Sequence, residues 1–218
     1  MLERDLYRPE REFFLADATT VAPLLLGGVL THRRPDGLVA LRITEVEAYL
    51  GVGLDPGSHA HRGRGKRNAT MFGGPGHLYV YFTYGMHACA NVVCSPEGVA
   101  SAVLLRAGEI IEGEAWAQGR RTRSTAAPVA VRDLARGPAR LTVAMGIALS
   151  DDGADALGSP FELRIPYAPC DYLVGPRTGV SGPGGSDTYP WRYWLANEET
   201  VSPYRKHVQK SRVRNESA

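Results

Sequence analysis

Two glutamates in a strand-like segment are the residues whose type and spacing most directly suggest chemistry. Glu45, Glu47 and Tyr49 alternate with Val46 and Ala48, and residues two apart in a β-strand point to the same face. Carboxylates on an otherwise apolar strand are costly unless they are solvated, paired or functional. On this segment alone, an edge strand with a solvated face is the simpler interpretation, and a functional site is the alternative.

An arginine and a tyrosine near strand ends are the next candidates. Arg106 closes the apolar run LLRA (104–107), and a buried arginine is almost always paired. Any nearby carboxylate could be its partner, whereas the functional interpretation places it beside Glu47 and a DNA phosphate. Tyr84 precedes Gly85 at the predicted tip of a hairpin, where an exposed ring suits insertion between base steps. Packing in the core or in an interface explains this tyrosine equally well.

The basic residues gather in three segments, although the net charge of the 218-residue chain is only +2. Solvated surface is the ordinary explanation for such segments, and three of them together are compatible with a surface that faces phosphates. They are a glycine-rich loop with Arg62, Arg64, Lys66 and Arg67, a second segment with Arg120, Arg121 and Arg123, and a tail from Arg205 to Arg214.

The cysteines and the hydropathy indicate a cytoplasmic protein. Cys89, Cys94 and Cys170 cannot all be paired, and their spacing fits no zinc module, so reduced thiols are expected. No apolar run reaches membrane-spanning length, and charge from Glu3 onward argues against a secretory signal. We therefore expect no bound metal and no membrane partner.

Hydrophobic periodicity and turn residues predict one α+β domain over residues 1–218. Its core is expected to be a curved, mostly antiparallel β-sheet with surrounding helices and a protruding β-hairpin, and the basic tail over 205–218 is a candidate for disorder. The expected strands are 28–34, 38–50, 77–83, 86–93, 100–107, 161–165 and 191–195, the expected helices are 19–26 (capped by Thr19 or Thr20), 109–119 and 139–145, and 51–76 and 181–187 are expected to be irregular.

Six segments form a pattern that covers most of the chain. They are ITEVEAYLG (43–51), SHAHRG (58–63), KRNATMFGGPGHLYVYFTYGMHACANVV (66–93), VLLRAGEIIEG (103–113), ARGPARL (135–141) and SPYR (202–205). A lone EAY or LLRA would carry no weight, whereas the long block from Asn68 to Val93 together with its flanking segments is highly specific. In order and spacing, the pattern resembles the alkyladenine (3-methyladenine) DNA glycosylase family of bacteria and animals.

The resemblance implies roles for five residues around a nucleotide that has been flipped out of the duplex. Glu47 corresponds to the general base of the family, which activates water for attack on the anomeric carbon. Arg106 would anchor that water and the phosphate of the flipped nucleotide. Tyr49, His59 and Tyr81 match the residues that wall the base pocket, and aromatic faces stack well on a cationic alkylated purine.

Further positions match residues that read the base, replace it or hold the DNA. His59 matches the residue that reads the hydrogen-bonding edge of the purine, and Asn91 matches one that crowds the amino group of guanine. Tyr84 matches the residue that fills the gap left in the duplex by the flipped nucleotide. Contacts with the DNA backbone are expected from Arg62, Arg64, Lys66 and Arg67.

The activity implied by the resemblance is that of a monofunctional DNA glycosylase of base-excision repair. The expected partner is double-stranded DNA with a damaged purine, and the lesions in question are 3-methyladenine, 7-methylguanine, hypoxanthine and ethenoadenine. No lysine lies in the segments matched to the pocket, so we expect hydrolysis without a Schiff base and no lyase activity. No metal or organic cofactor is implied, and binding through one hairpin face suits a monomer associated with the nucleoid.

Two other functions are compatible with parts of this pattern. A non-catalytic damaged-DNA-binding module of the same fold would be indicated by the loss of Glu47 or Arg106, and both are present. A small-molecule hydrolase that uses Glu45 and Glu47 as an acid–base pair is disfavoured. Carboxylates two apart on one strand lie side by side rather than on opposite sides of a sugar.

Overall fold

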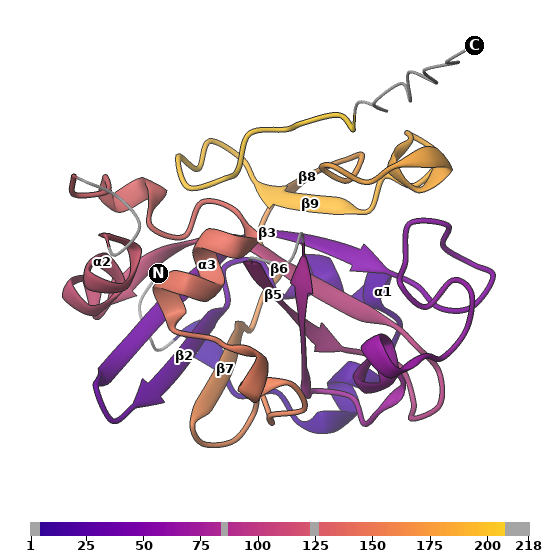
Figure 1. Ribbon diagram of the computed structural model, residues 1–218, viewed down its shortest axis with the longest axis horizontal. Helices are drawn as coiled ribbons and strands as arrows, with labels where there is room; N and C mark the ends of the chain where they lie inside the picture. Colours follow the sequence, from indigo (N-terminus) through magenta and orange to yellow (C-terminus); the bar gives the residue numbers. More distant parts are fainter. Residues whose placement is uncertain (1–4, 84–86, 123–126, 208–218) are drawn as a thin grey trace, which may run out of the picture.

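The computed structural model describes residues 5–83, 87–122 and 127–207, which form a large β-sheet with α-helices packed against it (Figure 1). The α+β class and the mostly antiparallel sheet predicted from the sequence are confirmed, since each described strand pair is antiparallel. The strands are β1 (Leu6–Tyr7), β2 (Val29–Arg34), β3 (Gly37–Tyr49), β4 (Leu78–Thr83), β5 (His87–Val93), β6 (Ala102–Glu112), β7 (Phe161–Pro166), β8 (Tyr172–Gly175) and β9 (Arg192–Leu195), and the α-helices are α1 (Ala18–Leu24), α2 (Glu114–Thr122) and α3 (Pro138–Met145).

The long strand β3 organises the sheet. The strand order is β1-β7-β2-β3-β6-β5-β4, and β9 pairs both with β3 and with β8. Along one edge β3 pairs with β6, and along the other it pairs first with β2 and then, over Glu45 to Glu47, with β9. The interpretation of this segment as an edge strand with a solvated face is therefore wrong. Both carboxylates lie inside the protein, where they must be paired.

Helix α1 begins at Ala18, so its N-cap precedes both of the predicted capping residues. The side chain of Asp17 accepts hydrogen bonds from the backbone N–H groups of Thr19 and Thr20, at 2.9 and 3.0 Å. A carboxylate at the N-cap satisfies N–H groups that have no partner inside the helix, and it also faces the positive end of the helix dipole. Asp17, rather than either threonine, is thus the capping residue, and the helix ends at Leu24 instead of residue 26.

The segment predicted as a helix over 109–119 is divided between a strand and a helix. Strand β6 continues to Glu112, because its end pairs with the start of β3 through Ala40 and Leu41. Gly113 then turns the chain with a φ of 75°, a left-handed conformation that favours glycine, and α2 follows. Strand pairing over long range has here outweighed a local helical pattern.

Several elements were absent from the sequence-based prediction. Strands β1 and β8 are short and lie at the margins of the sheet. Five short 3-10 helices are also present in the described part of the chain, and two of them lie in the segments 51–76 and 181–187 that were expected to be irregular. These 3-10 helices span Arg11–Leu15, Lys66–Phe72, Val131–Asp133, Leu149–Asp151 and Gly182–Gly185.

The main hydrophobic core joins the sheet to helices that approach it from different sides. Helix α1 contacts β3 and β6, whereas α3 contacts β3, β5 and β6 and also packs against α2; Figure 1 shows α3 in front of these strands. A second, smaller cluster includes Met71, Phe72 and Tyr79, and it joins the segment between β3 and β4, which contains Met71 and Phe72, to β4, which contains Tyr79. Within the described residues, no helix is long and apolar enough to cross a membrane.

Candidate active site

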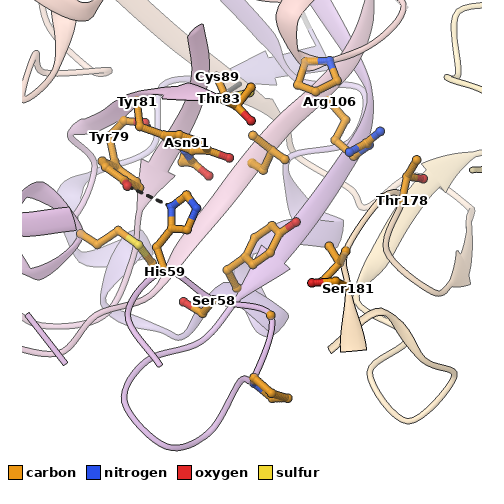
Figure 2. A pocket seen from close by; sticks show the side chains of 18 residues that line it. Ser58, His59, Tyr79, Tyr81, Thr83, Cys89, Asn91, Arg106, Thr178 and Ser181 are labelled. Carbon is orange, nitrogen blue, oxygen red and sulfur yellow. Dashed lines mark hydrogen bonds between the residues drawn. The ribbon is translucent and has the colours of Figure 1, made fainter. Parts of the chain in front are cut away.

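A cavity of about 460 Å³ opens where four parts of the chain meet. Its walls come from the end of β3, the segment that follows it, the β4–β5 hairpin with β6, and the segment after β8 (Figure 2). In Figure 2, His59, Tyr79, Tyr81 and Asn91 lie on one side of the cavity, and Arg106 and Thr178 on the opposite side. Of the predicted site residues that the structure describes, the cavity lining contains Tyr49, His59, Tyr81, Asn91 and Arg106.

A β-bulge directs Arg106 toward the two glutamates. The register pairs Glu45 with Ala107 and Val46 with Leu105, which leaves Arg106 as the extra residue on β6. A bulge of this kind re-aims a side chain that would otherwise follow the alternation of the strand. The guanidinium donates to Glu45 Oε1 through Nε at 2.9 Å, and its Nη1 lies 3.3 Å from Glu47 Oε1.

Glu47 is fully buried and is held by three residues that line the cavity. Its Oε1 accepts from the backbone N–H of Thr178 at 2.7 Å and faces Arg106, and its Oε2 accepts from the hydroxyl of Tyr49 at 2.7 Å. An ionised carboxylate has about four acceptor positions. Three are occupied by protein, so one more hydrogen bond to this carboxylate can come from a small donor such as water.

The hydroxyl of Tyr49 stays protonated in this setting. Loss of hydration inside the protein, and then the negative charge of Glu47, raise the pKa of Tyr49 well above its ordinary value. The neutral hydroxyl can therefore donate to Glu47 at any pH at which the protein is expected to work. The ring of Tyr49 meanwhile forms part of the cavity wall.

Glu45 forms the centre of a buried ionic network behind Arg106. Its Oε1 accepts from Arg192 Nε at 2.6 Å as well as from Arg106, and its Oε2 accepts from the backbone N–H of Ser202 at 2.7 Å. Burial raises the pKa of Glu45. The charges of Arg106 and Arg192 and the Ser202 hydroxyl together lower this pKa by more than burial raises it, so it lies below the ordinary value. Glu45 is therefore an ionised anchor for Arg106.

Arg106 likewise stays charged, because it is paired with carboxylates. Burial lowers the pKa of Arg106, but the carboxylates of Glu47 and Glu45 raise it more, and the net pKa lies above its ordinary value. One buried arginine thus bridges two buried glutamates while its side chain still reaches the cavity lining. The sequence predicted the pairing of Arg106 with Glu47 but not its bond to Glu45.

Three aromatic groups form the opposite wall. Nδ1 of His59 shares a hydrogen bond of 3.1 Å with the hydroxyl of Tyr79, and the rings of Tyr79 and Tyr81 are stacked with centroids 5.2 Å apart. The ring of His59 meets that of Tyr81 edge to face at 4.6 Å. Desolvation among these rings, and then the charge of Arg67, lower the pKa of His59 below its usual value, so the imidazole is neutral at pH 7.

Asn91 closes the inner end of this wall. It is buried, and its Nδ2 donates to the backbone carbonyl of Tyr79 at 2.9 Å, which fixes the amide at the cavity. Its neighbour Cys89 also lines the cavity as a neutral thiol, because burial raises its pKa to about 11. The predicted intercalating residue, Tyr84, lies outside the described residues.

The four basic residues predicted to contact the DNA backbone are exposed on one segment between β3 and β4. Arg67 has two further contacts within the protein: its Nη2 donates to the carbonyl of Phe82 at 2.9 Å, and its guanidinium lies over the ring of Tyr81. Asn68 anchors the segment by donating to the carbonyl of His59 at 2.9 Å. The four residues are Arg62, Arg64, Lys66 and Arg67.

Several site residues were missed by the sequence-based prediction. Tyr79 could have been found, because it shares a strand face with Tyr81 two residues later. Thr178 acts through its backbone, and Arg192 and Ser202 come from a distant part of the chain, so local patterns contain no signal for them. The Asp55–Arg177 ion pair, with contacts of 2.6 Å, is a further buried feature beside the cavity.

The sequence matches known proteins over most of its length. A model of the methylpurine-DNA glycosylase family matches residues 12–199. Three similar proteins are each named "Putative 3-methyladenine DNA glycosylase". The chain is 62% identical to that of Leifsonia xyli, with 93% of this chain and 95% of that protein covered. It is 55% identical to that of Streptomyces avermitilis (93% and 94%) and 47% identical to that of Burkholderia lata (88% and 89%).

Proposed function

Because the chain belongs to the methylpurine-DNA glycosylase family, we propose that it releases damaged purines from duplex DNA by hydrolysing the N-glycosidic bond. The proposed substrates are 3-methyladenine, 7-methylguanine, hypoxanthine and ethenoadenine. The reaction uses water as the nucleophile and forms no covalent bond with the protein, so no strand cleavage by β-elimination accompanies it.

The observation that carries this proposal is the carboxylate of Glu47, buried beside a cavity with one acceptor position left for water. Arg106 and the N–H of Thr178 hold Oε1, and the hydroxyl of Tyr49 holds Oε2. A base that is fixed in this way cannot turn away from the water that it orients. The same carboxylate lies close to the cavity that would receive the sugar of the flipped nucleotide.

The chemical step conserves atoms and charge. Water bound to Glu47 transfers a proton to the carboxylate as its oxygen forms the bond to C1′ of the sugar. The bond from C1′ to the purine nitrogen breaks, and its electron pair leaves with the base. A cationic purine leaves as a neutral molecule, whereas a neutral purine leaves as an anion, which then takes a proton from solvent water. Arg106 stabilises the negative charge of Glu47 before transfer and the adjacent phosphate of the nucleotide throughout.

Base recognition depends on the aromatic wall and on Asn91. A purine that enters the cavity can stack on the rings of Tyr49 and Tyr81, and each such contact contributes about 1–3 kcal/mol. Nδ1 of His59 is engaged by the hydroxyl of Tyr79, so Nε2 of the neutral ring is left for the edge of the base, as donor or acceptor according to the tautomer. Asn91 is fixed by its bond to Tyr79 and would crowd the amino group that distinguishes guanine.

The basic segment and Tyr84 complete the proposed DNA complex. Arg62, Arg64 and Lys66 are exposed and would contact phosphates, so the affinity for duplex DNA would fall with added salt. Tyr84 would fill the gap in the duplex and recover part of the few kcal/mol that flipping costs. We propose that the protein does this as a monomer in the cytoplasm.

The proposal is tested with end-labelled duplexes that contain a single hypoxanthine or ethenoadenine, together with 3-methyladenine release from alkylated DNA. After incubation with the protein, half of each sample is treated with alkali, which cuts the strand at abasic sites. We expect strand cutting only in the alkali-treated half. If the folded protein binds these duplexes and releases no base from any substrate, the alternative of a non-catalytic binding module is correct. Strand cutting without alkali would instead reveal lyase activity.

A further inference from the structure

A buried ion pair, formed by Arg177 and Asp55, lies next to residues of the cavity lining without lining the cavity itself. Both side chains are fully buried, and two contacts of 2.6 Å join their charged groups. Burying two charges is costly, and well-packed apolar residues of similar size would often stabilise a fold equally well. Stability alone is therefore a weak explanation for this pair, and the contacts of Arg177 indicate another role.

All five N–H groups of Arg177 are bonded within the protein. Two of them hold Asp55, one donates to the carbonyl of Ala48 at 3.0 Å, and two share the carbonyl of Gly184 at 2.7 and 3.1 Å. The guanidinium has no further donor, so Arg177 cannot hold a substrate by hydrogen bonds. Its planar group instead joins three segments of the chain in a fixed geometry.

Each of these three segments supplies part of the cavity wall. The first, the end of β3, contains Tyr49; the second runs from Asp55 into the lining residues 56–59; and the third runs from Arg177 into the lining residues 178–181. Arg177 is thus the point at which three parts of the wall are fastened to one another.

The segments are also in direct contact around the guanidinium. The carboxylate of Asp55 accepts from the backbone N–H groups of Leu50 and Gly57, at 3.1 and 2.8 Å. A methyl group on Gly184 would overlap the backbone nitrogen of Gly57, so the second and third segments touch where Arg177 joins them. Closely packed segments transmit a displacement, and a shift of one segment therefore moves the others.

Two of the three groups that hold Glu47 are next to Arg177. The backbone N–H of Thr178, the following residue, donates to Glu47 Oε1, and the hydroxyl of Tyr49 donates to Oε2, both at 2.7 Å. The centre of the Arg177 guanidinium is 4.4 Å from the centroid of the Tyr49 ring, which is a cation–π contact. The third group, Arg106, lies on β6 and has its own anchor.

We propose that Arg177 is a positioning residue for the general base. Acting through its two neighbours, it keeps the carboxylate of Glu47 in the orientation that presents one acceptor position to water. This inference rests on the proposed glycosylase function and adds a residue that serves the reaction without touching the substrate. A displacement of about 1 Å can cost about a hundredfold in rate, so loss of Arg177 slows base release.

The test is a double-mutant cycle on the rate constant of base release. It is measured in single turnover with saturating protein, on the lesion duplex from which the wild-type protein releases base fastest. Asp55→Asn/Arg177→Met removes the ion pair without leaving one charge unpaired, and Arg177→Lys keeps the charge but lacks the planar fork and two of the five donors. Each variant is made in the wild-type protein and in Glu47→Gln.

Arg42→Met is the matched control. Arg42 also bonds two carboxylates, those of Glu109 and Glu198, but it does not line this cavity. The dissociation constant for the lesion duplex is measured for every variant, and thermal melting shows which variants are folded. If the double variant unfolds, Arg177→Lys decides the question, because it retains the charge that faces Asp55.

In the wild-type background we expect base release to slow by about 10–100-fold, less in Arg177→Lys than in the double variant. In the Glu47→Gln background the same changes should slow it by less than about threefold, because a residue that acts through the base has no further effect once the base is absent. The dissociation constant should stay close to that of the wild type, and Arg42→Met should release base at the wild-type rate.

Two results would overturn the inference. The first is release at the wild-type rate by folded Arg177 variants. The second is an equal loss of rate in the wild-type and Glu47→Gln backgrounds, which would mean that Arg177 supports the cavity as a whole rather than the base. Both differ from failure of the proposed function, in which the wild-type protein releases no base.

Discussion

The buried network around Glu45 leads to a prediction about stability that can be worked out from its contacts. Glu45 is fully buried, and its two arginine partners, Arg106 and Arg192, have side chains that are 7% and 5% exposed. Glu45→Gln keeps one carbonyl oxygen as an acceptor but removes the negative charge that both guanidinium groups face. Breaking a buried ion pair by removal of one partner costs about 3–5 kcal/mol. We expect a loss of about 3 kcal/mol, at the lower end, because Arg106 retains Glu47.

Chemical denaturation at pH 7 measures this loss directly. Glu109→Gln is the matched control, because it makes the same chemical change in a glutamate that also pairs with an arginine across β3 and β6. Glu109 pairs with Arg42 at 2.7 Å, but its side chain is 44% exposed. Exposed pairs contribute about 0–1 kcal/mol, so the control variant should unfold at nearly the wild-type denaturant concentration.

The loss of stability in Glu45→Gln should become smaller as the pH falls. The net pKa of Glu45 in the folded protein lies below its ordinary value of 4.5. The ion pair therefore contributes fully above pH 4.5, and its contribution is lost as the pH falls toward the folded pKa. The difference in unfolding free energy between wild type and Glu45→Gln should narrow in that acidic range. A difference below about 1 kcal/mol at pH 7, or one that does not change in acid, would refute this account of the network.

Three further predictions concern the cavity and the sheet. Asn68→Ala leaves the carbonyl of His59 without its donor; we expect the unfolding free energy to fall by about 1–3 kcal/mol and KM for lesion DNA to rise, whereas an unchanged KM would mean that the segment is held in other ways. An NMR titration of His59 should have its midpoint below 6.5, and a midpoint above that value would contradict the neutral imidazole proposed at pH 7. Gly108→Ala would put a methyl group 2.6 Å from side-chain carbons of Leu41; denaturation should show a loss of at least about 1–3 kcal/mol, and wild-type stability would show that the two strands can separate locally.

The sequence predicted those parts of the fold that are encoded locally. The hairpin of β2 and β3 follows from the turn at residues 35–37, and the second hairpin follows from alternating apolar residues around a glycine. The failures have a common cause: contacts from distant segments override local patterns. Strand β6 extends to Glu112 because it pairs with β3, and no local signal in a helix-like segment reports such a partner.

The site was predictable to the extent that its side chains lie on strands of known periodicity. Glu47, Tyr49 and Arg106 come together as expected, because β3 and β6 are neighbours. Glu45 looked like a second functional carboxylate, but Arg192 of β9 and Ser202 convert it into a structural anchor. These partners are about 150 residues away in the chain, so only the folded structure distinguishes the roles of the two glutamates.

The most direct test of the central claim, that Glu47 is the general base of a hydrolytic glycosylase, is single-turnover base release by Glu47→Gln measured alongside its affinity for lesion DNA. We expect the rate constant for release to fall by about 10²–10⁴-fold, while the dissociation constant for the duplex stays within a few-fold of wild type and the protein remains folded. Glu109→Gln again provides the control, with a rate near that of wild type. A Glu47→Gln variant that releases base at close to the wild-type rate would contradict the central claim.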